Sequence, residues 1–231
     1  MAKRRRTRKA GGGSPVRRIA AFLLLVLLSA LIFLAPTLLR RPVPVPDAEA
    51  EARVTAVLPE GLDHTRRSFV LTACSLVGRV GYFWGGKSDA LGWDSRWGAP
   101  AVVTAEGGSD TGAILPFGLD CSGYISWTAV NAAEHTDALN VIGSGVRDQW
   151  AKCRPVTASE ARSGDLAFFP DLSHVGIVAG READGTLLVL HCSRTLGGVV
   201  LSPDAEAIGF TLFGDPDYYL LYGDTMPYLQ R

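Results

Sequence analysis

Apolar and polar residues follow patterns that change along this chain. After the capping residue Asp63, apolar side chains recur with the three- and four-residue spacing of a helix. A second helix is predicted from Asp120 to about Glu134, and a shorter one near residues 145–152. Farther on, short apolar runs separated by turns predict strands at DLAFF, HVGIVAG, GTLLVLHCS, GGVVLS and YYLLYG. Helices followed by an antiparallel sheet indicate an α+β domain.

The apolar run at residues 19–39 contains 21 residues and no charge, which suits the roughly 20 residues that a helix needs to cross a bilayer. Eight Lys or Arg residues precede the run and two follow it. Because positive charge is retained on the cytoplasmic side, we expect residues 1–18 to form a basic cytoplasmic tail. The sequence thus predicts a signal-anchor at 19–39 and a single-pass protein of the cell membrane with its C-terminal body exported.

A cleaved signal peptide is the alternative for this run, and it would make the protein secreted. The run exceeds the usual stretch of about 7–15 apolar residues in such signals. Pro36 follows FLA, the best small-residue cleavage motif, and is a poor start for a cleaved product. These features favour an uncleaved transmembrane anchor.

The formal net charge of zero conceals a strong asymmetry between the two ends of the chain. Residues 1–41 hold ten basic and no acidic residues, which leaves 13 basic against 23 acidic residues in the remainder. An acidic body with a basic tail is not typical of nucleic-acid-binding proteins, so we expect no nucleic-acid partner. Residues 40–61 begin with the proline-rich RRPVPVP, which favours an extended linker before a globular domain at 62–231.

Cys121 stands where a loop becomes a helix, in the stretch GLDCSGYISW. A thiol at a helix N-terminus faces unpaired backbone N–H groups and the positive end of the helix dipole. Its pKa is therefore expected to fall, and the nucleophilic thiolate to form. The alternative is that Cys121 is only a small core residue, and this stretch by itself does not decide between the two.

Two histidines offer a base for that thiol. His174 begins the strand HVGIVAG, His191 ends LLVLHCS, and the turn READG joins the two strands. Because antiparallel neighbours place the start of one strand near the end of the next, we expect both imidazoles at one sheet edge beside Cys121. The thiolate would attack a carbonyl, His174 would carry the proton to the leaving amine, and His191 would hold the tautomer of His174. The amide of Cys121 would donate to the developing oxyanion.

Five segments within residues 65–222 resemble, in sequence and in order, the NlpC/P60 family of cell-wall cysteine peptidases: GYFWGG, GLDCSGYISW, SGDLAFF, HVGIVAG and LLVLHCS. The resemblance implies a papain-like fold and hydrolysis of peptidoglycan stem peptides, commonly between the γ-carboxyl of D-glutamate and a diamino acid. It places the nucleophile on Cys121, the base on His174 and the third polar residue on His191. It implies no cofactor.

The resemblance also implies a set of substrate-binding residues. The tyrosine before the Trp-Gly-Gly turn falls on Tyr82, and with Asp120 and Ser122 it would hold the free amino end of the substrate. An acidic side chain is a reasonable partner for an ammonium group, although Asp120 would also serve as a helix N-cap. We expect Trp84, in the same turn, to contribute to this site.

The chain departs from the family pattern in two respects. Residues 87–119 are longer than the usual link between the Trp-Gly-Gly turn and the cysteine, and they are rich in Gly, Ser, Asp and Trp. Long loops in compact domains are usually functional or mobile, so we expect this segment to gate access to the site. The chain also has no recognisable wall-binding repeat, so its position would come from the membrane anchor or from a protein partner.

Three other functions are compatible with parts of the pattern. A zinc site built from the same cysteines and histidines is disfavoured, because His191 and Cys192 are adjacent in a strand and point to opposite faces. An acyltransferase on the same scaffold and a non-cleaving wall-binding module both remain open. Of the other three cysteines, Cys153 and Cys192 would be the candidate disulfide pair, and buried free thiols are the alternative.

Overall fold

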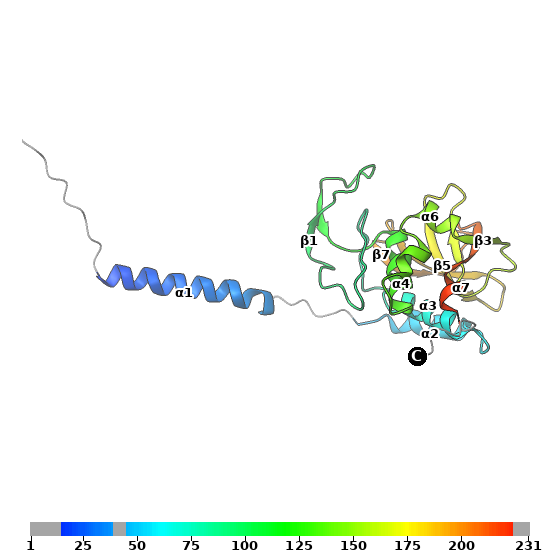
Figure 1. Cartoon of the computed structure of the whole chain (residues 1–231), viewed down its shortest axis with the longest axis horizontal. Coiled ribbons are helices and arrows are strands. Elements are labelled where there is room, and N and C mark those ends of the chain that lie inside the picture. Colours follow the sequence, from blue (N-terminus) through cyan, green and yellow to red (C-terminus); the bar gives the residue numbers. More distant parts are fainter. Residues whose placement is uncertain (1–14, 39–44, 224–231) are drawn as a thin grey trace, which may run out of the picture. The chain divides into compact units, whose positions relative to one another are not determined.

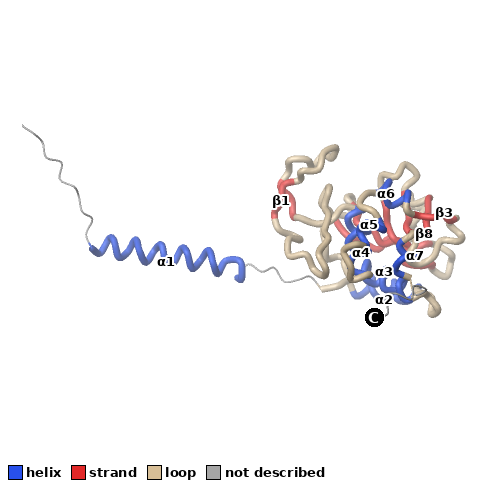
Figure 2. Tube along the Cα trace, in the orientation of Figure 1, coloured by secondary structure: helices blue, strands red, loops and turns tan. Residues whose placement is uncertain are grey.

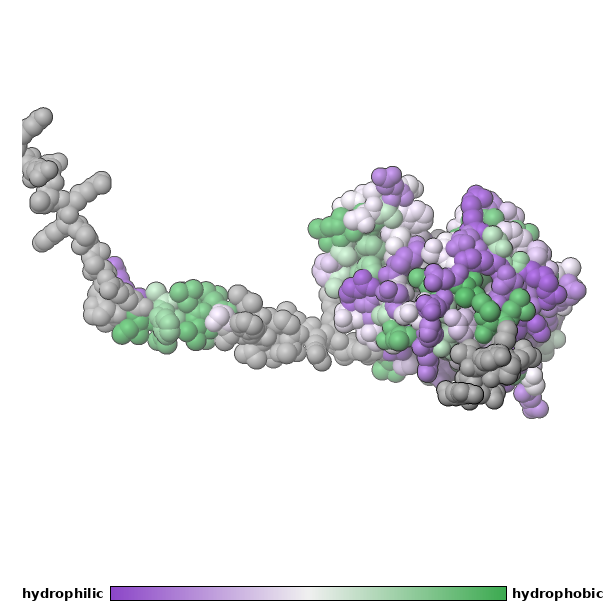
Figure 3. Space-filling view, in the orientation of Figure 1, coloured by the Kyte–Doolittle hydropathy of each residue, from purple (hydrophilic) through white to green (hydrophobic). Residues whose placement is uncertain are grey.

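The computed structural model describes residues 15–38 and 45–223. The chain divides into two units, Met1–Val43 and Pro44–Arg231. The described part of the first unit is the helix α1 (Pro15–Leu38), on which the apolar side chains from Phe22 to Leu28 are exposed (Figure 3).

The predicted basic tail at residues 1–18 lies largely outside the described residues, and the predicted anchor at 19–39 lies partly outside them. Within the described part of the chain, no helix has the length and apolarity that a membrane span requires. The membrane anchor therefore stays a prediction.

A six-stranded antiparallel sheet lies at the centre of the second unit (Figures 1 and 2). Four of its strands occur where the pattern predicts them: β4 (Leu166–Phe168), β5 (Val175–Arg181), β6 (Leu187–Ser193) and β7 (Gly198–Ser202). The spatial order is β3-β8-β4-β5-β6-β7, with the unpredicted strands β3 (Cys153–Val156) and β8 (Leu212–Pro216) at one side. The predicted α+β class with an antiparallel sheet is confirmed.

Helices cover the sheet from one face: α3 (His64–Cys74), α4 (Cys121–Ala132), α5 (Ala138–Ile142) and α6 (Val146–Ala151). Helices α3 and α4 pack on each other and on β5. Successive residues of β5 point to opposite faces of the sheet and pack in two separate hydrophobic cores. Ile177 and Ala179 pack in the larger core, which also contains residues of the helices. Val178 points the other way and packs in a smaller cluster with Phe210 and Phe213.

The predicted linker at residues 40–61 differs from the structure over part of its length. Residues 48–57 form a helix, α2 (Ala48–Val57), whose first N–H groups donate to the carboxylate of Asp47. Ala50 and Val54 lie four residues apart, on one side of the helix, and both are buried against α3 and β5. Burial of this apolar face stabilises a helix where the proline-rich start suggested an extended chain.

The predicted strand at YYLLYG is instead a helix, α7 (Tyr218–Tyr222). Tyr218 is fully buried, and its ring lies 5.2 Å from that of Phe69 on α3. The strand partner of β3 and β4 is supplied by β8, directly before α7. The β-propensity of tyrosine was therefore overridden by packing against α3.

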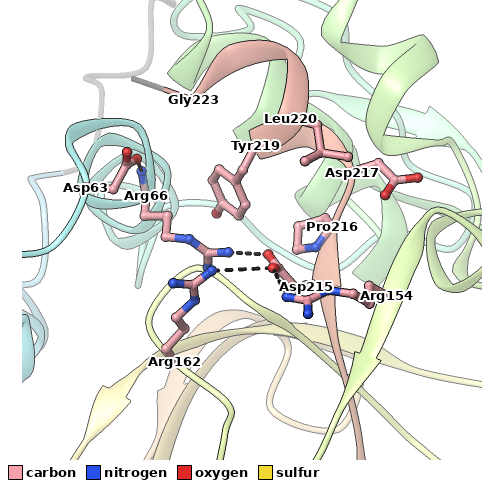
Figure 4. Close-up of a pocket in the computed structure, with 10 residues that line it drawn as sticks. All are labelled: Asp63, Arg66, Arg154, Arg162, Asp215, Pro216, Asp217, Tyr219, Leu220 and Gly223. Atoms are coloured by element: carbon pink, nitrogen blue, oxygen red, sulfur yellow. Dashed lines mark hydrogen bonds and ion pairs between the residues drawn. The ribbon is translucent and has the colours of Figure 1, made fainter. Parts of the chain in front are cut away.

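Arg66 joins α3 to the sheet through buried ion pairs. Its guanidinium donates to Asp165 at 2.7 Å and also bonds Asp215 of β8. Arg154 and Arg162 approach the second oxygen of Asp215 at 2.8 and 3.3 Å (Figure 4). A cavity of about 350 Å³ lies among these groups and is lined by none of the candidate catalytic residues. Because opposite charges are paired throughout, we assign this cluster a structural role.

Residues 87–119 are attached to the domain at several points. The segment contains a short antiparallel hairpin of β1 (Pro100–Val102) and β2 (Ile114–Pro116). Trp97 is buried and packs edge-on against Trp127 of α4, with ring centroids 5.5 Å apart. The predicted gating role is not tested by these contacts, but the base of the segment is held in place by aromatic packing.

Candidate active site

Cys121 is the first residue of α4, as the loop-to-helix pattern predicted. Asp120 caps the helix, with extended backbone angles (φ −90°, ψ 179°) and an Oδ1 that accepts the N–H of Gly123 at 2.6 Å. The first N–H groups of a helix have no acceptor within the helix. The backbone N–H of Cys121 is one of these groups, so it is not used by the helix's own hydrogen bonds. Cys121 itself is only 7% exposed.

The two predicted histidines form a continuous polar chain with a serine. His174 Nε2 and His191 Nδ1 are 2.8 Å apart, and His191 Nε2 lies 2.9 Å from Ser202 Oγ. His174 directly precedes β5, and β5 pairs antiparallel with β6, which carries His191. Ser202 ends β7 and was not identified from the sequence. A buried serine on the next strand gives no local signal of such a role.

The thiol and the imidazole share one neighbourhood. The backbone N–H groups of Val175 and Ser122 donate to Cys121 Sγ, so the thiol lies against the start of β5, one residue beyond His174. Nδ1 of His174 has no hydrogen-bond partner among the described residues, whereas its Nε2 is bonded to His191. Nδ1 of His174 is thus the imidazole nitrogen that the chain of hydrogen bonds leaves unpaired among the described residues.

The expected fall in the pKa of Cys121 is not found in this structure. Burial, and then the carboxylate of Asp120, raise the pKa of the thiol to about 11. Lys87 and the two backbone N–H groups act in the opposite direction, but they do not overcome the loss of water around the sulfur. With a pKa of about 11, the thiol of Cys121 is protonated at neutral pH.

Packing against aromatic rings explains why the two imidazoles are uncharged. Phe169 and Phe210 lie against His174, with ring centroids 5.0 and 5.4 Å away, and Phe210 also lies 5.4 Å from His191. Burial lowers the pKa of His174 to about 4, with the charge of Asp120 opposing the shift. Burial, and then the neighbouring His174, lower the pKa of His191 to about 3. Both imidazoles are therefore neutral at pH 7.

The predicted substrate-binding residues occupy different positions. Tyr82 is half-buried, and its backbone forms an isolated bridge with Leu119, two residues before Cys121. Burial, and then the charges of Cys121 and Asp120, raise the pKa of its hydroxyl. Trp84 instead donates its indole N–H to the carbonyl of Glu106 at 3.1 Å, within the 87–119 segment. The structure thus places Tyr82 beside the loop that leads into Cys121, while the indole of Trp84 is bonded to the long segment.

Lys87 is part of this site and was not identified from the sequence. Its ammonium Nζ lies 2.7 Å from Asp120 Oδ1 and 2.5 Å from Ser122 Oγ. Ser122 Oγ also lies 3.1 Å from the same carboxylate oxygen. The two polar groups that flank Cys121 are therefore bonded to a cation from the chain itself.

All four cysteines are free thiols. The candidate pair Cys153 and Cys192 does not form a disulfide, because Cys153 lies in β3 and Cys192 in β6, and three other strands of the sheet separate them. Cys153 Sγ contacts the carbonyl of Gln149 and Cys192 Sγ that of Leu119, each at 3.1 Å. The second alternative, free thiols, describes both residues, with Cys192 buried and Cys153 partly buried.

Comparison with known families decides the broader assignment. Residues 79–207, more than half of the chain, match the NlpC/P60 family. This chain belongs to the NlpC/P60 family. Members of the family are usually peptidoglycan hydrolases of the cysteine peptidase type, although some are non-catalytic. The matched range contains Cys121, His174 and His191.

Solved structures of similar fold include several from mycobacteria. The peptidoglycan hydrolase RipB of Mycobacterium tuberculosis is 22% identical, with a TM-score of 0.45 and coverage of 89% of this chain and 91% of that one. The P60 domain of antigen MAP1204 from M. avium subspecies paratuberculosis is 24% identical (TM-score 0.43; 64% and 95% coverage). RipD of M. tuberculosis, described as a non-catalytic NlpC/p60 domain protein, is 18% identical (TM-score 0.45; 65% and 96% coverage). No curated protein matches the chain.

Proposed function

We propose that this chain is a cysteine endopeptidase that hydrolyses peptidoglycan stem peptides. The observation that carries the proposal is the position of three groups at the start of α4, directly before β5, and in β6. A thiol begins α4, an imidazole with a free Nδ1 precedes β5, and a second imidazole is bonded to the first at 2.8 Å. This is the order of nucleophile, base and orienting group that acyl-transfer chemistry requires.

Each group has a defined part in the reaction. Cys121 Sγ attacks the carbonyl carbon while its proton passes to Nδ1 of His174. The amide N–H of Cys121 donates to the oxyanion that develops on the carbonyl oxygen. His174 then protonates the leaving amine, the C–N bond breaks, and an acyl-thioester remains on Cys121. Water, deprotonated by His174, attacks the thioester and releases the new carboxylate and the free thiol.

Hydrogen bonding favours the tautomer that this reaction needs. Nδ1 of His174 must be unprotonated to accept the thiol proton, so its own proton must be on Nε2. That N–H donates to Nδ1 of His191, whose proton is then on Nε2 and donates to Ser202 Oγ. Ser202 as an acceptor thereby favours the basic form of His174 through two hydrogen bonds.

The resemblance to the family supports the D-γ-glutamyl–diamino acid bond as the bond that is cleaved. We further propose that residues 19–39 anchor the protein in the cell membrane, with the basic tail in the cytoplasm and the catalytic domain outside. The exposed apolar side chains from Phe22 to Leu28 on α1 support this placement, because a contiguous exposed apolar surface is typical of a membrane or protein interaction site.

A non-cleaving wall-binding module is the second candidate function. The burial of Cys121 and the rise of its pKa to about 11 favour it, because a protonated, covered thiol is a weak nucleophile. In the peptidase reading, His174 removes the proton only as the substrate carbonyl is attacked, and no free thiolate has to accumulate.

The test is digestion of muropeptides by the full-length chain in detergent, followed by mass spectrometry, beside Cys121→Ala. New fragments that vanish in the variant would support the peptidase, and their masses would identify the bond. Folded parent protein that binds muropeptides without cleaving them would support the wall-binding module. Cleavage that persists in Cys121→Ala would refute the assignment of the nucleophile.

A further inference from the structure

Lys87 occupies the place where a substrate ammonium is expected in this family. The resemblance assigns the free amino end of the substrate to Asp120 and Ser122, which flank the nucleophile. In this chain, both groups are already bonded to Lys87 Nζ, at 2.7 and 2.5 Å. Oδ1 of Asp120 also accepts the N–H of Gly123 and contacts the hydroxyl of Ser122. Oδ1 of Asp120 therefore already has three partners from the chain itself.

The position of Lys87 is built into the backbone around it. The N–H of Asp120 donates to the carbonyl of Gly86 at 3.0 Å, which holds the Lys87 loop against the start of α4. A Cβ at residue 123 would overlap that carbonyl and lie 3.1 Å from Cδ of Lys87, so the glycine in the first turn of α4 makes room for both. Asp120 and Ser122 are 8% and 5% exposed, so the ammonium is bonded to buried partners.

The ammonium of Lys87 is itself partly accessible, since 41% of its side chain is exposed. An ammonium has three N–H donors, and the described residues accept two of them. The third donor suits a neutral acceptor such as an amide carbonyl oxygen. A second ammonium at this point would face a like charge and would find Asp120 already neutralised.

We propose that Lys87 is a specificity-determining residue that selects stem peptides whose N-terminal amine is acylated over those with a free amine. An acylated N-terminus is what a stem peptide has while it is attached to the glycan strand, so the enzyme would act on intact wall rather than on released peptides. This inference rests on the proposed function, because it concerns the substrate of the same site.

The test compares two forms of one peptide, L-Ala-γ-D-Glu-diaminopimelate with a free or an acetylated N-terminus, as substrates of the full-length protein. The parent should prefer the acetylated form in kcat/KM. Lys87→Met should shift the ratio toward the free amine by about tenfold or more, which corresponds to about 1.4 kcal/mol, mainly through KM. Lys87→Arg should keep the preference of the parent. Lys152→Met is the matched control, because Lys152 is also ion-paired, with Asp148 at 3.4 Å, and lies outside the site; it should leave the ratio unchanged.

Binding to Cys121→Ala separates this inference from the proposed function. If the parent cleaves neither peptide, the proposed function fails, and calorimetry with Cys121→Ala and Cys121→Ala/Lys87→Met still measures the preference. The same shift of about tenfold in the ratio of dissociation constants would uphold the role of Lys87. An unchanged ratio in catalysis or in binding, or no binding of either peptide, would overturn it.

Discussion

Replacement of Ser202 by alanine tests the hydrogen-bond chain behind His174. The variant removes the acceptor for Nε2–H of His191, which is only 4% exposed and has no other partner for that nitrogen among the described residues. His191 can recover a bonded state only by moving its proton to Nδ1. That N–H then donates to Nε2 of His174 and forces the proton of His174 onto Nδ1, where it blocks transfer from Cys121.

The size of the effect follows from the cost of an unpaired buried donor, roughly 1–3 kcal/mol. If the whole cost falls on the productive tautomer, kcat/KM should fall by about 5-fold to about 150-fold. The loss should appear mainly in kcat, because Ser202 is only 5% exposed and its hydroxyl is bonded to His191, which leaves little of it for a substrate to contact.

The assay is steady-state hydrolysis of a purified muropeptide by the full-length protein, with thermal unfolding measured in parallel. Ser202→Thr keeps the hydroxyl and should retain most of the activity. Ser163→Ala removes a serine that is 2% exposed and bonds neither histidine, and it should leave kcat/KM unchanged. Activity of Ser202→Ala within twofold of the parent, with the fold intact, would refute the tautomer argument.

Three further predictions follow from the charges in the structure. The rate of Cys121 alkylation by iodoacetamide should keep rising with pH toward about 11, because burial raises the pKa of the thiol; a plateau below pH 7 would instead indicate a thiolate–imidazolium pair. The free energy of unfolding, measured with urea, should fall by about a few kcal/mol as the pH is lowered from about 6.5 to about 4. The folded pKa values of His174 and His191 are about 4 and about 3, so the unfolded chain binds more protons than the folded one in this range of pH. Equal stability at both ends of the range would contradict this prediction. Arg66→Met should lower the free energy of unfolding by about 3–5 kcal/mol, because it leaves the buried carboxylate of Asp165 without its ion-pair partner. A loss below about 1 kcal/mol would count against the structural role of the cluster.

Much of the scaffold was predictable from short-range pattern. The cap at Asp120 and the apolar run after it predicted α4, and alternating runs with a tight turn predicted β5 and β6. Because a hairpin fixes which residues of two strands lie opposite each other, the sequence also predicted that His174 and His191 would meet. These inferences needed only neighbours within about twenty residues.

Other elements were decided by packing between distant segments. The helix α2 formed in a stretch predicted as linker because Val54 is buried against α3 and β5, and the tyrosine run formed α7 because Tyr218 packs on Phe69. Local propensity is a weak preference beside the burial of a large side chain. Neither outcome could be predicted without knowing which surface lay opposite.

The sequence by itself determined the residue types of the site and their order along the chain, since helix caps and strand periods are local properties. Only the tertiary structure decided their chemical state. Phe210 packs against both histidines and removes water from them, and Lys87 reaches Asp120 from 33 residues away. Desolvation and ion pairing depend on every group that folding brings within a few ångströms. For that reason the neutral state of Cys121 and the occupied carboxylate beside it had no signature in the sequence.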